Sequence, residues 1–162
     1  MAVITEKSDQ LTNLDASPPV IENSHNLHGR LRVAYFSHTL GDGDAGSSVE
    51  VVRLPPGKIR LLGSLCNIEA ATVAASATMD VGWDAYTDLD GAAVDADADG
   101  IVDGVSVDTT LNVNLAGNAT TGVLTAGTKA FESQDGVSIR LTFVGAVVAG
   151  ETVDGYLVYV QD

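Results

Sequence analysis

The residues best suited to chemistry in this chain are the aspartates of residues 94–104, VDADADGIVDG. Their spacing, D-x-D-x-D-G-x-x-D, matches the first nine positions of a calcium-binding loop, in which carboxylates two residues apart converge on the cation. Gly100 would permit the sharp turn of such a loop. The predicted ligands are the side chains of Asp95, Asp97, Asp99 and Asp103 and the carbonyl of Ile101.

The calcium interpretation has a bland alternative. The twelfth loop position, normally a bidentate Glu, is Ser106, and Asp108 lies two residues further on. A complete site would need an outside ligand, a rearrangement that brings in Asp108, or water. Otherwise Asp and Gly simply fill an exposed turn, in which salt screens the repulsion between carboxylates. We therefore expect that the protein requires no cofactor, and calcium is the only cofactor that the sequence suggests.

Catalytic chemistry has little support elsewhere. His25 and His28 lie three residues apart in a segment without helical period, so we expect no metal site there. Cys66 lies in an apolar run, which predicts a buried structural cysteine. No nucleophile elbow, Walker loop or dinucleotide fingerprint occurs. Carboxylates are too abundant to indicate a glycosidase. We expect no enzymatic activity.

Composition narrows the partners. The net charge of −14 argues against nucleic acid and anionic membranes, and it favours cations or a basic protein surface. The single cysteine excludes an internal disulfide and suits a reducing compartment. The N-terminus does not read as a signal peptide and no apolar run has membrane-spanning length, so we expect folding in a cytoplasm.

The chain divides into two parts. Residues 1–29 are polar, contain Pro18-Pro19 and show no period, which predicts an extended arm that needs a partner surface. Residues 30–162 form the predicted domain. Few aromatic residues, 17 glycines and repeated turn signals favour an all-β sandwich or jelly roll.

Within the domain, apolar and polar residues alternate with the period of strands that have one buried face. We expect such strands within residues 31–35, 49–52, 58–61, 79–85, 111–115 and 137–143. Leu31, Val33 and Tyr35 share one face in this pattern. Residues 156–160 are apolar on both faces, which predicts a central strand or one at a subunit interface.

Four features follow one another in a fixed order. An arm leads into RLRVA at 30–34, a Gly/Asp turn and VEVV at 49–52 run into LPPGKIRLLG at 54–63, MDVGW at 79–83 opens into DAYTD, and GYLVYV at 155–160 closes the chain. This order resembles the small structural proteins encoded near the coat gene of tailed bacteriophages, which decorate or cement the head.

The resemblance implies a jelly-roll or lectin-like β-sandwich. It also implies a homotrimer on local threefold positions of the expanded head, with the major capsid protein as partner. It implies assembly in the host cytoplasm and a final place on the virion surface. It carries over no catalytic residues. In that family the arm commonly contacts the shell, and the matching positions in this chain are Thr12, Pro18, Pro19, Ile21, His28 and Arg30.

A second hypothesis is a calcium-dependent carbohydrate-binding module. The aspartate segment would then hold the ion, and Tyr86 or Trp83 would lie near the sugar. Trp83 also shares a strand face with Met79 and Val81, which favours a place in the core.

Overall fold

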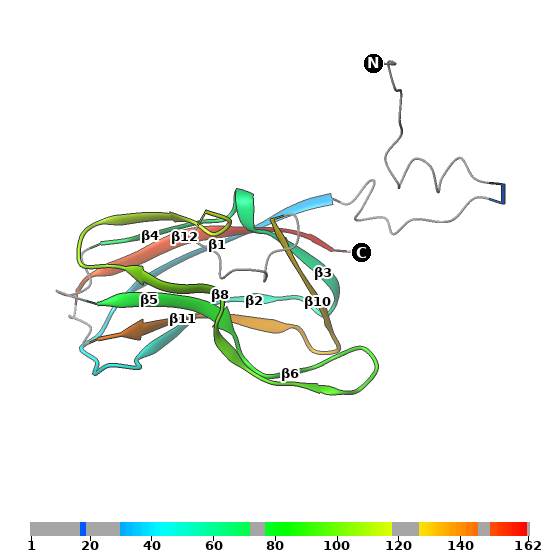
Figure 1. Ribbon diagram of the computed structural model, residues 1–162, viewed down its shortest axis with the longest axis horizontal. Coiled ribbons are helices and arrows are strands. Elements are labelled where there is room, and N and C mark those ends of the chain that lie inside the picture. The colour runs from blue at the N-terminus through cyan, green and yellow to red at the C-terminus, as the bar shows by residue number, and fades with distance from the viewer. Residues whose placement is uncertain (1–16, 19–29, 72–76, 118–126, 146–149, 162) are drawn as a thin grey trace, which may run out of the picture.

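The computed structural model describes residues 17–18, 30–71, 77–117, 127–145 and 150–161. Two packed β-sheets form a sandwich, and a small two-stranded hairpin extends from one end (Figure 1). The elements are β1 (Arg30–Thr39), β2 (Ser48–Leu54), β3 (Gly57–Leu62), the 3-10 turn η1 (Gly63–Leu65), β4 (Asn67–Ala70), β5 (Thr78–Trp83), β6 (Tyr86–Thr87), β7 (Ala93–Val94), β8 (Asp97–Ser106), β9 (Leu111–Asn114), β10 (Thr128–Ser133), β11 (Val137–Val144) and β12 (Thr152–Gln161). No described helix is long and apolar enough to cross a membrane.

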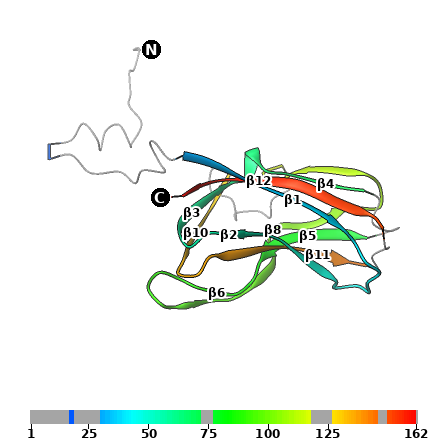
Figure 2. The same cartoon turned by 180° about the vertical axis from the view of Figure 1, so that it is seen from behind.

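Strand β12 is the centre of the six-stranded sheet. On one side it pairs antiparallel with β1 along its whole length, from Arg30↔Gln161 to Thr39↔Thr152. On its other side it pairs first with β3 and then with β4, which are followed outward by β10 and β9. Figure 2 shows β1 and β12 side by side in the same layer. The prediction of a central strand at residues 156–160 is confirmed.

The strand formed by β3 and β4 is interrupted by η1, and a thiol fills the gap. Between the pairs Tyr159↔Leu61 and Tyr156↔Asn67 the backbone ladder is broken. Here the Val158 N–H donates to Sγ of Cys66 at 3.2 Å, and the thiol donates to the Leu62 carbonyl at 3.2 Å. Burial raises the pKa of Cys66 to about 11, so the thiol keeps its proton at neutral pH. Cys66 is the buried structural cysteine that the apolar run predicts.

The four-stranded sheet has the order β2-β11-β5-β8. Its central strand β11 alternates as predicted, because Ile139, Leu141 and Phe143 are buried while Ser138 and Arg140 point outward. The inward faces of the two sheets form one continuous core. Its largest fully buried side chains are Leu54, Ile59, Leu61, Ile68, Met79, Ile101, Leu115, Phe131, Ile139, Leu141, Phe143 and Leu157.

Strand β1 reverses one expectation. The sequence predicts that Leu31, Val33 and Tyr35 face the core, but their side chains are 60%, 47% and 79% exposed. The alternation correctly groups these residues on one face. That face is the outer one, because the partly buried Ala34 and Phe36 pack against the core instead. Periodicity identifies residues that share a face but does not say on which side the second sheet lies.

Removal of the Cys66 thiol should destabilise the fold. In Cys66→Ala the buried N–H of Val158 loses its acceptor, so the free energy of unfolding should fall by about 1–3 kcal/mol. Cys66→Ser keeps a donor and an acceptor and should fall less. Urea denaturation followed by Trp83 fluorescence measures both. Equal stability of Cys66→Ala and the wild type would contradict this role for the thiol.

Candidate interaction surface

The aspartate segment is a strand, so the predicted turning loop is wrong. Residues 97–106 form β8, the edge strand beside β5. The register passes from Val81↔Val102 to Trp83↔Asp97, which places three extra residues in β8. Such a bulge leaves side chains crowded along an edge rather than converging on one point. Calcium binding was predicted from loop geometry that this strand does not have.

The predicted ligands are therefore distributed along β8 and the approach to it. Ile101 is fully buried. Burial and the neighbouring Asp99 raise the pKa of Asp97. Burial also raises the pKa of Asp80, and the negative charges of Asp103 and Asp99 raise it further. Among the described residues no group of three or more His, Cys, Asp or Glu side chains could hold a metal ion. Calcium binding by Asp95, Asp97, Asp99, Ile101 and Asp103 stays a prediction from spacing alone.

The glycine of this segment serves packing. A Cβ on Gly100 would lie 2.4 Å from the Trp83 ring, so only glycine lets β8 cross that ring. Trp83 is 8% exposed, donates from Nε1 to the Asp95 carbonyl at 3.2 Å and lies 4.2 Å below the Lys129 ammonium. Trp83 is thus a core residue, as its strand face predicts. A sugar platform at Trp83 is not available in this fold.

Tyr86, the second aromatic residue of the carbohydrate hypothesis, also packs against the core. Tyr86 is half-buried, with its ring 6.2 Å from that of Phe131 in an edge-to-face arrangement. Burial raises the pKa of its hydroxyl, and the charges of Asp88 and Glu132 add to the shift.

Most of the predicted shell-contacting residues lie outside the described part of the chain. Thr12, Pro19, Ile21 and His28 belong to this group. Pro18 is exposed. Arg30 is also exposed and is the first residue of β1, which lies at the edge of the six-stranded sheet.

The outer face of β1 and β12 is the most unusual surface of the described residues, and we call it the β1–β12 face. Three cross-strand pairs lie on it: Leu31↔Val160, Val33↔Val158 and Tyr35↔Tyr156. Leu31, Val33, Tyr35 and Tyr156 are exposed, whereas Val158 and Val160 are buried beside them. The two tyrosine rings lie 5.9 Å apart. Contiguous exposed apolar side chains of this kind mark sites of protein contact. The sequence contained the signal, in the alternation of residues 31–35, but we expected it to be buried.

Two hollows border the polar end of this face. One, of about 270 Å³, is lined by Tyr35, Tyr156 and Asn67 among others, and its neighbour, of about 360 Å³, lies between β4, β9 and β12. Glu69 and Asp154 line both. The face therefore passes from apolar residues to carboxylates along the strand direction.

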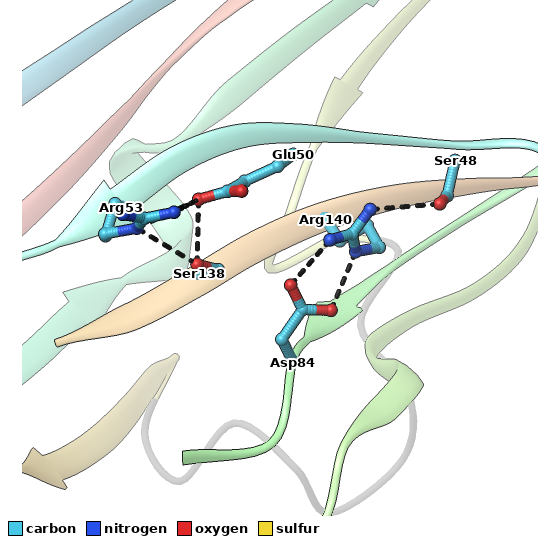
Figure 3. Close-up of polar contacts among 6 residues, drawn as sticks. All are labelled: Ser48, Glu50, Arg53, Asp84, Ser138 and Arg140. Carbon is cyan, nitrogen blue, oxygen red and sulfur yellow. Dashed lines mark hydrogen bonds and ion pairs between the residues drawn. The ribbon is translucent and has the colours of Figure 1, made fainter. Parts of the chain in front are cut away.

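The outer face of the four-stranded sheet has a different character. Arg140 donates to both carboxylate oxygens of Asp84 at 2.7 and 2.6 Å and to the Ser48 hydroxyl at 3.1 Å (Figure 3). Glu50 accepts from Arg53 and from Ser138. The hydrogen bond from Arg140 holds the pKa of Asp84 below its usual value. Because these charged groups are paired with one another, they leave few unpaired charges on this face to bind a partner.

No known protein family and no curated protein matches this chain. Among solved structures, a chain of the cyanophage Pam1 capsid asymmetric unit is similar with a TM-score of 0.53 and 16% identity, over 88% of this chain and 92% of that one. Chains of infectious bursal disease virus, strains Gx and Gt, have TM-scores of 0.42 and 0.38 at 13% and 10% identity. This chain spans about a third of the length of those two.

The likeness to the Pam1 capsid chain shows a shared fold. The all-β, jelly-roll-like sandwich that the sequence predicts is confirmed by the sheets themselves and by this neighbour.

Removal of the negative charge of Asp97 on β8 should stabilise the protein. Folding raises the pKa of Asp97, so the ionised carboxylate lowers the stability of the folded state at pH 7. This loss of stability disappears as the pH falls below the pKa of an unfolded aspartate, which is about 4. Asp97→Asn should raise the Tm by a few degrees at pH 7 and by nothing near pH 3.

Asp90→Asn, in an exposed turn, removes the same charge as a control. An equal rise in Tm for both variants, measured by thermal denaturation, would assign the effect to net charge and not to the bulge.

Proposed function

We propose that this chain is a structural virion protein, a trimeric decoration or cement protein that binds the expanded phage head at local threefold positions and stabilises it. The observation that carries the proposal is the fold likeness to a chain of the cyanophage Pam1 capsid, which extends over nearly the whole of both chains. The order of the four sequence motifs, which resembles that of phage decoration proteins, is a second reason for the proposal.

The surface of the molecule suits assembly better than catalysis. The carboxylates with shifted pKa values, Glu50, Asp80, Asp84 and Asp97, do not line the two hollows of the β1–β12 face. Exposed apolar and aromatic residues occupy that face instead. A trimer would multiply many shallow contacts into tight binding, since three linked sites dissociate together.

Charge supports a protein partner of opposite sign. With a net charge of −14 the chain would be drawn to a basic surface, and in this proposal that surface belongs to the major capsid protein. Residues 12–30 are the proposed contact with the shell, and β1 would fix the end of this segment in the sandwich.

Immunogold labelling tests the virion assignment. Particles purified from lysates of the cells that produce the chain should carry label on their outer surface, because a decoration protein stays on the finished head. A chain found only in the particle-free supernatant would contradict the proposal.

Deletion of residues 1–29 tests the role of the arm. The truncated chain should keep its oligomeric state, because the sandwich begins at β1, and should lose at least tenfold in affinity for the same particles. Co-sedimentation with particles stripped of the native protein measures the affinity. Undiminished binding by the truncated chain would exclude the arm as the main contact.

A further inference from the structure

The exposed apolar side chains of the β1–β12 face stand on strands that are already ordered: Leu31, Val33 and Tyr35 on β1, and Tyr156 on β12. Val33 pairs with Val158 and Tyr35 with Tyr156, so their backbones are fixed by the sheet. The contact between the two tyrosine rings limits their rotamers before any partner arrives. Tyrosine contributes large contact area at low entropic cost, and it is enriched where proteins meet.

One end of the face carries an arginine. Arg60 on β3 is in register with Val160, which is in register with Leu31. Arg30 begins β1 at the same end, but it pairs with Gln161 and therefore points to the opposite side of the sheet. Within the described residues neither arginine has an ion pair, whereas Arg53, Lys58 and Arg140 are each paired with a carboxylate. A basic group of a strongly acidic chain is thus available at this end.

The other end of the face carries carboxylates. Glu69 and Asp154 are directly opposite each other in the β4–β12 ladder, an arrangement that destabilises a sheet when both are charged. Glu69 accepts a hydrogen bond from the Asn112 amide at 2.7 Å. The described residues supply no cation to either carboxylate. A guanidinium from outside the chain would relieve the repulsion.

The two ends are complementary and too far apart to meet within one molecule. Val160 and Asp154 are six residues apart on β12, or about 20 Å. We propose that a second copy of this chain covers the β1–β12 face, with the arginine end of one copy against the Glu69–Asp154 end of the next. A head-to-tail contact of this kind can close into a ring. The inference rests on the proposed trimer and assigns its contact surface.

A matched pair of valines tests the apolar centre. Val33 and Val144 are 47% and 53% exposed, but Val144 ends β11 in the other sheet. Val33→Glu should raise the dissociation constant of the oligomer at least tenfold in light-scattering measurements, and Val144→Glu should leave it unchanged. Circular dichroism checks that both fold. A monomeric wild type, or an unchanged oligomer in Val33→Glu, overturns the inference.

Charge reversal tests the orientation. Arg60→Glu and Asp154→Arg should each weaken the oligomer, and the double variant should recover at least half of the summed loss. Because the two positions are too distant to couple within a chain, recovery must arise between copies. A double variant as weak as the sum of the two single variants overturns the head-to-tail arrangement.

Particle binding separates this inference from the proposed function. Labelled particles together with an unchanged oligomer in Val33→Glu would overturn the inference and leave the virion role standing. An oligomer that responds as expected, with no labelled particles, would do the opposite. A Val33→Glu protein that stays oligomeric but no longer binds particles would assign the face to the capsid protein and overturn the contact between copies.

Discussion

The structure depends on the position of β12 between β1 and the broken strand formed by β3 and β4. Every other strand of the six-stranded sheet is attached through it, directly or through one neighbour. Because β12 contributes inward Leu157 and Val153 to the core and outward Tyr156 to the surface, it joins the interior of the sandwich to the face proposed for assembly. The Cys66 thiol preserves this arrangement by replacing the hydrogen bonds that η1 removes from the ladder.

The sequence indicated where the strands lie, but it did not indicate which face of a strand is buried or where a strand bulges. Alternation located β11 and β5 correctly, since the apolar residues of their pattern are buried within both strands. The predicted pattern of β5 ran too far, because Ala85 lies beyond the strand and is exposed. Alternation failed at β1, where the large apolar residues point away from the core. An edge strand that serves an interface has the same period as one that serves a core, so no single-chain pattern separates them. The side became evident only when the position of the second sheet was known.

The turning loop predicted for the aspartate segment is wrong for a different reason. Its spacing fits a calcium loop, yet Ile101 and Val102 are drawn into the core and extend the chain as β8. The burial of two apolar side chains outweighs the turn tendency of Asp and Gly, because each contributes about 1.5–3 kcal/mol. Gly82 and Gly100 then allow β8 to pass close to β5 and Trp83. Burial on this strand, together with the neighbouring Asp99, raises the pKa of Asp97.

The long pairing of β1 with β12 has a mechanical consequence. Consider a force applied at Arg30 along the axis of β1. Hydrogen bonds of an antiparallel ladder lie across that axis, so the ten register pairs from Arg30↔Gln161 to Thr39↔Thr152 would share the load in shear. Peeling would instead break the pairs one after another. The pairing of β1 with β12 would therefore resist a pull along β1 more strongly than a pull across it.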